Sequence, residues 1–304
     1  GPPSPATAAA APASPAPAPA ASPAPPPPRP AAPLDAGALA AALGAELKEQ
    51  PGGVLKASWP RKEVKVSVDG VPLAPPAGLS SWAAFQPTAD GAMLMGDTVV
   101  FEDEVSPAID AAFASGLEVT ALHNHFFFDR PKVYFMHIGG HGDGARLAAG
   151  VKAVWDAVKA VRAARKSPAD RFGGARVAKG TLDAGALEAA LGHPLEVSGG
   201  VAKATIGREG TMHGVRVGGP MGLTTWIAFS GSDAGAAVSG DLIMTAEEVQ
   251  PVLRALRQNG LHVVALHNHM VGGEPFFYFV HFWGKGKAID LAAGFKKVLE
   301  AQAR

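Results

Sequence analysis

The alternation of apolar and polar residues predicts short helices and strands that follow one another along the chain. Positions 64–68 alternate with the period of two that is typical of a half-buried strand. Asp35 is placed to cap a short helix that Gly44 closes, because an Asp side chain accepts from free N–H groups and glycine ends helices in the left-handed conformation. Further strands are expected at 53–57, 82–85, 93–101, 117–125 and 133–138, and further helices at 103–115 and 144–165. Helices interleaved with adjacent hairpins predict an α+β fold with a mixed or mostly antiparallel sheet.

The chain contains an internal duplication, which organises everything after position 33. Each copy should therefore be one structural unit, with homologous repeats at 34–166 and 181–304 and a linker at 167–180. The recurring segments are LDAGAL (34–39 and 182–187), SWAAF with TWIAF (81–85 and 225–229), GD (96–97 and 240–241), ALHNH (121–125 and 265–269) and LAAG (147–150 and 291–294).

Residues 1–33 consist almost entirely of Ala, Pro and Ser and predict a disordered tether. Such a segment buries too little apolar surface to offset its ordering entropy, and it should sample extended polyproline conformations. The chain as given begins Gly1-Pro2 and does not read as a signal peptide.

Composition excludes several classes of protein. Its 27 basic and 27 acidic residues balance, which argues against a partner that is nucleic acid and against a polybasic membrane binder. The chain has 0 cysteines, so it cannot form a disulfide, use a thiolate nucleophile or bind zinc through cysteine. Its apolar stretches are also too short to span a bilayer.

Six of the 10 histidines fall in one repeated pattern, which is the only concentrated chemistry in the sequence. On a strand, His123 and His125 point to the same face. A hairpin that turns near Arg130 pairs His137 with His123, and one that turns near Pro131 pairs it with His125. Either register brings His137 to that face. The second copy repeats this spacing with His267, His269 and His281.

Three imidazoles on one face form a ligand set suited to Cu²⁺ or Zn²⁺, and also compatible with Fe or Mn. In the first copy, a fourth ligand within loop reach is offered by His141, Asp129 or Asp143, whereas Lys285, Gly273 and Lys287 stand at the matching positions. If only one copy binds metal, this comparison favours the first. Further candidates, as ligands or as partners that orient a histidine ring, are Asp97, Glu104, Asp241 and Glu248.

Each of these residues also has a purely structural interpretation. A histidine beside aromatic residues can be a hydrogen-bonded core residue, and duplication would copy it. Glu104 and Glu248 each stand near the start of an expected helix, where a carboxylate is favoured by the helix dipole.

The order of these motifs resembles the LppY/LpqO type of bacterial lipoprotein over nearly all of 34–304. The resemblance rests on Gly-Asp, then Glu-Val-x-Pro (104–107 and 248–251), the ALHNH strings, Tyr-Phe-x-His (134–137 and 278–281) and Leu-Ala-x-Gly. It implies an exported protein of the periplasm or cell envelope, acylated on an N-terminal cysteine that this sequence does not contain. Membrane contact would be made only through that anchor. The resemblance implies no activity.

The sequence therefore predicts an envelope-exposed protein that binds a metal ion or small ligand, involved in copper or zinc handling. One alternative is a metal-dependent enzyme, a hydrolase or oxygenase with an open coordination position. Another is a non-catalytic module that binds peptidoglycan or protein and has structural histidines. The metal, the substrate and the oligomeric state are left open.

Overall fold

A computed structural model describes residues 31–303, so the predicted tether lies almost wholly outside the described residues. The six helices of this part are α1 (Ala36–Leu43), α2 (Val105–Ala114), α3 (Gly144–Ala164), α4 (Ala184–Leu191), α5 (Ala246–Gln258) and α6 (Ala288–Gln302). None of them is long and apolar enough to cross a membrane.

One twelve-stranded sheet runs through both repeats, and its strand order is β1-β2-β5-β6-β9-β7-β16-β17-β15-β14-β11-β10. The first repeat contributes β1 (Lys48–Gln50), β2 (Val54–Pro60), β5 (Ser80–Thr88), β6 (Gly91–Phe101), β7 (Glu118–His123) and β9 (Val133–Gly142). The second contributes β10 (Glu196–Ser198), β11 (Val201–Gly207), β14 (Thr224–Ser232), β15 (Gly235–Met244), β16 (His262–His267) and β17 (Tyr278–Gly286). The pairings are antiparallel, which confirms the predicted α+β class.

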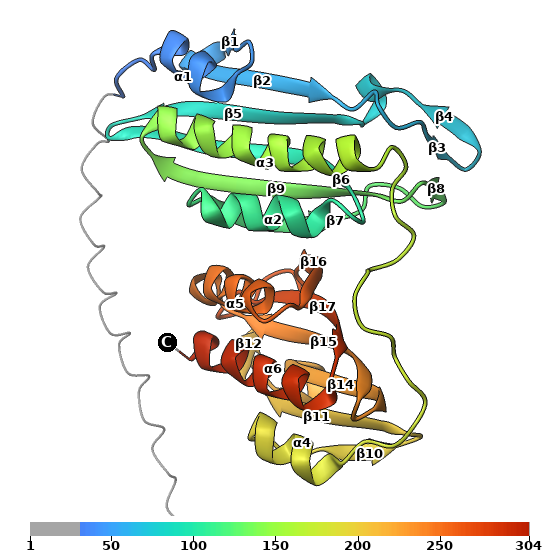
Figure 1. The fold of residues 1–304 in the computed structure, drawn as a ribbon. Coiled ribbons are helices and arrows are strands. Elements are labelled where there is room, and N and C mark those ends of the chain that lie inside the picture. The colour runs from blue at the N-terminus through green and yellow to red at the C-terminus, as the bar shows by residue number, and fades with distance from the viewer. Residues whose placement is uncertain (1–30, 304) are drawn as a thin grey trace, which may run out of the picture.

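The helices lie on one face of this sheet, in front of the strands in Figure 1. The main hydrophobic core fills the space between them and contains residues of both repeats, such as Phe85 and Val151 of the first and Phe229 and Phe295 of the second. Alternation along β6 shows the division between the faces, because Leu94 is buried against the helices whereas Met93 and Met95 are exposed on the opposite, helix-free face.

The expected strand at 64–68 forms, but it does not join the main sheet. It is β3 (Val66–Val68), which pairs with β4 (Val71–Leu73) and β8 (Asp129–Arg130) in a small three-stranded sheet. In the second repeat β12 (Gly210–Met212) and β13 (Val215–Val217) pair in the corresponding place. In the first repeat this small sheet covers a separate hydrophobic cluster in which Val66, Phe101 and Phe135 are buried.

The two repeats meet at β7 and β16, where Leu122 pairs with Leu266. Side chains from the helices extend this narrow junction. The amide of Gln250 on α5 both donates to and accepts from the backbone of Val119, at 2.8 and 3.1 Å. Asp110 on α2 receives two hydrogen bonds from the guanidinium of Arg257, at 2.8 and 2.9 Å. The two repeats therefore pack as one body.

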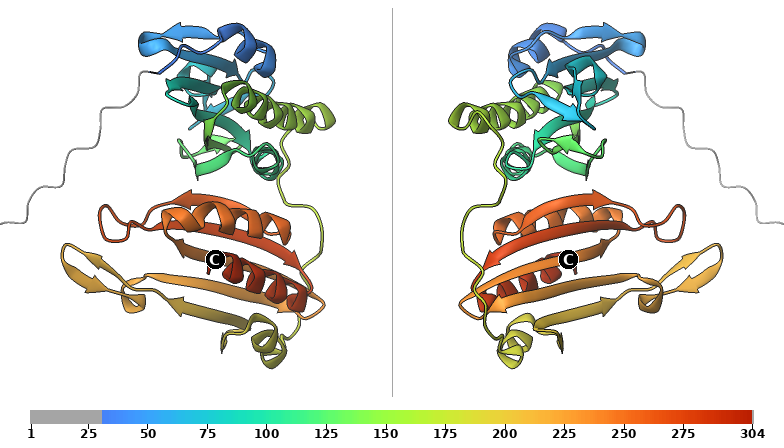
Figure 2. Two further views of the ribbon diagram at one scale, coloured as in Figure 1. Left: turned by 90° about the vertical axis from the view of Figure 1, so that its left-hand side faces the viewer. Right: turned by 90° about the vertical axis from the view of Figure 1, so that its right-hand side faces the viewer.

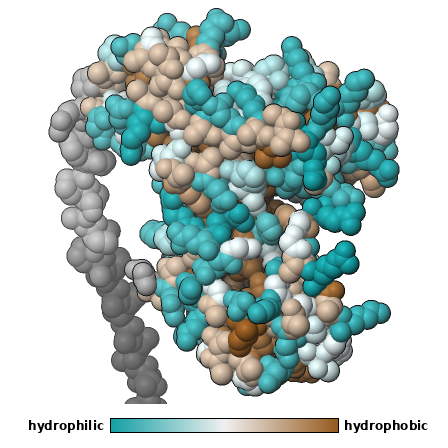
Figure 3. Space-filling model, in the orientation of Figure 1, coloured by the Kyte–Doolittle hydropathy of each residue, from teal (hydrophilic) through white to brown (hydrophobic). Residues whose placement is uncertain are grey.

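Sheet twist accumulates across this junction. In Figure 2, α2 is seen end-on while α5 and α6 run across the view. The linker passes over the junction on the helix side, where the molecular surface is hollowed between the two halves (Figure 3). A cavity of about 210 Å³ lies there, lined by Tyr134, Phe172 and Val263 among others.

The repeated Gly-Asp step has a packing explanation. Gly96 lies opposite Ile138, and Gly240 lies opposite Phe282, so each glycine makes room for a large core side chain on the helix side. A Cβ added at Gly96 would lie 2.9 Å from Cγ1 of Ile138. A Cβ added at Gly240 would overlap the Phe282 ring and the carbonyl oxygen of Trp226.

We expect Gly240→Ala to lower the free energy of unfolding by about 3 kcal/mol and the matched Gly96→Ala by about 1 kcal/mol, because the isoleucine can turn away and the phenylalanine ring cannot. Urea titration followed by circular dichroism measures both. Equal losses in the two variants would show that the close approach of Phe282 does not matter.

Candidate metal centre

Three strands, with the chain that follows β7, bring four of the predicted ligands of the first repeat together on the helix-free face. Asp97 on β6 is the direct cross-strand partner of His137 on β9. His137 in turn lies opposite Ala121 on β7, and His123 lies opposite Phe135. The ring nitrogens of His123, His125 and His137 offer ligand atoms that all lie within 4.8 Å of one another.

Both predicted registers of the hairpin are wrong by a small even number of positions. His137 pairs with Ala121 rather than with His123 or His125. The chain between β7 and β9 leaves the main sheet so that β8 can pair with β3, and this excursion moves the turn toward the N-terminus. An even shift keeps each strand side chain on its face, so His123 and His137 still lie on the same face.

His125 reaches the site by a different route from the one predicted. Strand β7 ends at His123, so strand alternation does not position His125. Its ring stacks instead on Phe135, with centroids 3.3 Å apart and planes 4° from parallel. The rings of His123 and His125 are then 5.2 Å apart, and those of His123 and His137 are 5.1 Å apart. The sequence analysis did not predict this role for Phe135. The recurring Tyr-Phe-x-His string does place a phenylalanine two residues before His137 and two before His281.

The second repeat builds the same site. His269 stacks on Phe279 with centroids 3.5 Å apart, and His267 lies 5.1 Å from His269 and 5.0 Å from His281 between ring centroids. Asp241 pairs directly with His281 across β15 and β17. The two histidine groups match residue for residue, so the geometry gives the first copy no advantage.

Backbone carbonyls orient several of the rings through one nitrogen only. The Nδ1 atoms of His123 and His267 lie 3.3 Å from the carbonyl oxygens of Asn124 and Asn268. The Nδ1 of His281 lies 3.4 Å from the carbonyl oxygen of Gly240. Contacts of this kind hold metal-binding histidines in one tautomer and leave Nε2 as the ligand.

A buried carboxylate stands beside each histidine group. Oδ2 of Asp97 lies 4.0 Å from Nε2 of His137, and Oδ2 of Asp241 lies 3.6 Å from Nε2 of His269. The Oδ1 atoms of both aspartates are buried and have no hydrogen-bond partner within residues 31–303. A buried polar atom without a partner costs free energy, and both repeats carry such an atom at the same place, beside the three histidines.

Burial also governs the charge state of the site. Burial raises the pKa of Asp97 and of Asp241, although the nearby histidines oppose this. Burial lowers the pKa of His125, His137 and His269 below the ordinary value of 6.5, and neighbouring histidines add to the effect. These three rings are therefore neutral, as metal ligands must be, to a lower pH than free histidine.

The other predicted ligands lie elsewhere in the described part of the chain. Asp129 accepts a hydrogen bond from the backbone N–H of Val133 at 2.7 Å. Asp143 caps α3 by accepting from the N–H of Arg146 at 2.8 Å. His141 lies on β9 four residues beyond His137 and is 3.2 Å from Asp90. The two histidine groups include none of the three.

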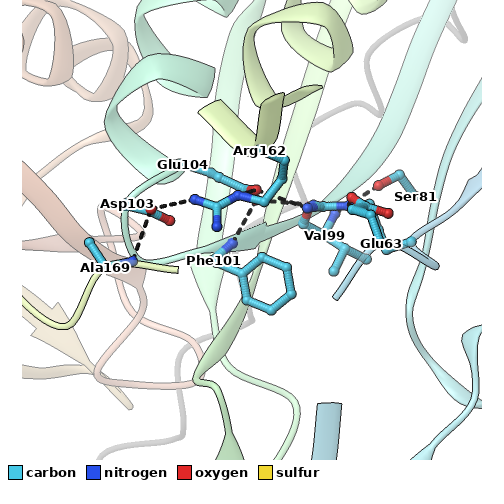
Figure 4. A network of polar contacts seen from close by, with 9 residues as sticks. Glu63, Ser81, Val99, Phe101, Asp103, Glu104, Arg162 and Ala169 are labelled. Carbon is cyan, nitrogen blue, oxygen red and sulfur yellow. Dashed lines mark hydrogen bonds and ion pairs between the residues drawn. The ribbon is translucent and has the colours of Figure 1, made fainter. Parts of the chain in front are cut away.

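Glu104 and Glu248 are held by arginines. Glu104 is fully buried. Its carboxylate accepts two hydrogen bonds from Arg61, at 2.9 and 3.0 Å, and one from the N–H of Phe101, at 2.9 Å. It also forms an ion pair with Arg162 (Figure 4). Glu248 pairs with Arg208 and accepts from the N–H of Thr245, with which it forms a capping box at the start of α5. Both carboxylates are committed to the fold.

The chain belongs to the family described as Domain of Unknown Function (DUF1259), which it matches twice, at residues 37–157 and 185–301. The two matches coincide with the two repeats seen in the sheet. The comparison with curated proteins gives no match.

Two solved structures of bacterial microcompartment shell proteins show a weak likeness. The trimeric shell protein PduB is 10% identical, with 83% of this chain and 89% of that chain covered and a TM-score of 0.20. The double-ringed trimeric shell protein MSM0271 of the RMM microcompartment is 11% identical, with 84% and 95% covered and a TM-score of 0.20. Superposition at this level transfers neither assembly nor function.

We expect Glu104→Gln to lower the free energy of unfolding by about 3 kcal/mol, because Arg61 and Arg162 lose a buried counter-charge. Glu248→Gln should cost about 1 kcal/mol, since the Arg208 side chain is 30% exposed and water can solvate it. Urea unfolding measures the losses, and metal analysis of the folded variants should find bound metal unchanged. A loss of metal from folded Glu104→Gln would place this carboxylate in the metal site after all.

Proposed function

We propose that this protein binds transition-metal ions, one at each repeat, and serves in copper or zinc handling. The observation that carries the proposal is a group of three converging histidines beside a buried aspartate oxygen that has no hydrogen-bond partner within residues 31–303. Equivalent strands of the two repeats build this group twice. The two copies have diverged around these groups, for example at Phe126–Asp129 against Met270–Gly273.

The donor set suits Zn²⁺ or Cu²⁺. His123, His125 and His137 would supply neutral imidazole nitrogens in the first repeat, and Asp97 would supply the negative charge. His267, His269, His281 and Asp241 would do the same in the second. A bound divalent ion would relieve the desolvation that raises the pKa of both aspartates. Such an ion can also act as a Lewis acid.

Metal handling is favoured over metal-dependent catalysis by the position of the carboxylates. A hydrolase needs a base near the metal in addition to the metal ligands. Glu104 and Glu248, which the sequence predicts as further ligands or as partners that orient a ring, are both paired with arginine and are not free to act as that base. A purely structural role for the histidines is disfavoured because the exposed His125 and the half-exposed His123 and His137 line the helix-free surface instead of filling the core.

We extend the proposal to the location of the protein, as an exported protein held at the cell envelope. The support for this is the Ala/Pro-rich character of residues 1–33 and the resemblance of the repeated motifs to LppY/LpqO lipoproteins. Metal ions that enter the envelope would then meet the helix-free face directly.

We expect protein purified without nickel chromatography and titrated with Zn²⁺ or Cu²⁺ to bind two ions per chain. The triple change of His123, His125 and His137 to Ala should reduce this to one, and so should the matched change of His267, His269 and His281. Mass spectrometry under native conditions counts the ions. Combining all six changes should abolish binding.

Asp97→Asn is the sharper control, because it keeps the shape of the side chain and removes its charge. It should weaken the ion of the first repeat by about 10- to 100-fold while the second repeat stays unchanged. Full binding by the sixfold histidine variant would overturn the proposal.

Metal affinity should depend on pH in a defined direction. Because burial lowers the pKa of His125, His137 and His269 below 6.5, protons should compete little above about pH 6.5. Below the lowered pKa of these rings, the affinity should fall by about tenfold per pH unit for each ring that must lose a proton. Competition with a chelator at pH 8, 7, 6 and 5 measures this. Affinity that never falls as the pH is lowered would show that the histidines are not the ligands.

A further inference from the structure

A row of exposed sulfur-containing side chains runs along β6 away from the first histidine group. Met93 is 47% exposed and Met95 is 62% exposed, although methionine is ordinarily a core residue. Both lie on the helix-free face, because Asp97, Met95 and Met93 alternate with buried Gly96 and Leu94. The sequence does not single out either methionine, because the sequence of a strand does not tell which of its two faces is covered.

The facing strand completes a groove. In the β6–β9 ladder, Asp97 lies opposite His137, Met95 opposite Gly139 and Met93 opposite His141. Gly139 has no side chain, so the floor between the two histidines is open. The resulting groove has a volume of about 370 Å³, and its lining includes Met93, Met95, His137 and His141. His137, a member of the first histidine group, therefore lies at one end of the groove.

His141 is already oriented as metal-binding histidines are. Its Nε2 lies 3.2 Å from Oδ1 of Asp90 and 3.4 Å from Oγ1 of Thr88. A carboxylate that holds one ring nitrogen fixes the tautomer and leaves the other nitrogen as the ligand. The Nδ1 of His141 makes no hydrogen bond within residues 31–303 and is the nitrogen left for a ligand.

The second repeat shows that this groove is not required by the fold. There the ladder places Ser239 opposite Trp283 and Ala237 opposite Lys285. The second repeat thus has no sulfur at these positions. Lys285 stands where the first repeat has His141, and Trp283 stands where the first repeat has Gly139. The histidine group itself is the same in both repeats, whereas the groove beside it is found in the first repeat and not in the second.

We propose that Met93, Met95 and His141 form a binding site for a soft monovalent metal ion, Cu⁺, distinct from the two histidine groups. Thioether sulfur is a soft, polarisable donor that selects Cu⁺ over hard cations, and an imidazole nitrogen completes such a ligand set. The groove connects this site to His137, so Cu⁺ bound there lies on the path to the first histidine group. The site rests on its own residues and does not require that the histidine groups bind metal.

Ag⁺, which has the same charge and similar softness but does not change oxidation state, is the probe. The full chain labelled with ¹³C at its methionine methyl groups contains 7 such probes. Addition of one equivalent of Ag⁺ should shift the methyl resonances of Met93 and Met95. The buried Met136 and Met244 should not move, and Met221, which is 72% exposed but belongs to the other repeat, should move only with excess Ag⁺.

Met93→Leu with Met95→Leu keeps the size of both side chains at exposed positions and should lower Ag⁺ affinity by 10- to 100-fold. His141→Ala should lower it by a smaller factor. Zn²⁺ binding by both variants should equal that of the unchanged chain, which separates this site from the histidine groups. Absent or non-selective methyl shifts, or unchanged Ag⁺ affinity in the double variant, would overturn the proposal whatever the result with Zn²⁺.

Discussion

The register of the antiparallel pairing between β6, β9 and β7 is the constraint on which the candidate site depends. It sets Asp97 beside His137, and it places His123 beside the phenylalanine on which His125 stacks. Because side chains alternate between faces, a slip of one position would turn His137 into the hydrophobic core and Ile138 out into water. Packing of the core on the helix side therefore fixes the register, and the register fixes the positions of His123 and His137.

This division of the sheet into two faces explains how the site can be chemically open and still well positioned. The helices bury one face, and the polar contacts of Gln250 and Arg257 join the two repeats on that side. Within residues 31–303 no helix covers the central strands on the opposite face, so packing constrains the side chains there less. The buried negative charge of Glu104 lies outside this site and is neutralised by ion pairs with Arg61 and Arg162.

Duplication followed by divergence gives the molecule an internal comparison. Both repeats keep the three histidines, the aspartate and the stacked phenylalanine. They differ in the surroundings, where Gly139 and Met95 of the first repeat correspond to Trp283 and Ser239 of the second. The buried ion-pair network differs too, since Gln302 takes the place beside Glu248 that Arg162 takes beside Glu104. The candidate site is therefore shared by the two repeats, whereas its surroundings differ between them.

The sequence by itself determined the two repeats, the α+β class and the shared face of His123 and His137. These follow from local patterns: repeated strings, the periods of strands and helices, and the even spacing that keeps side chains on one face. Only the tertiary structure decided the pairing of His137 with Ala121, the stacking of His125 on Phe135, the capture of Glu104 and Glu248 by arginines, and the exposure of Met93 and Met95. The physical reason is that each of these depends on which distant segments meet, through the excursion of β8 to β3 and through the choice of face that the helices cover. A sequence pattern records the spacing along one strand, and it does not record what lies across from it.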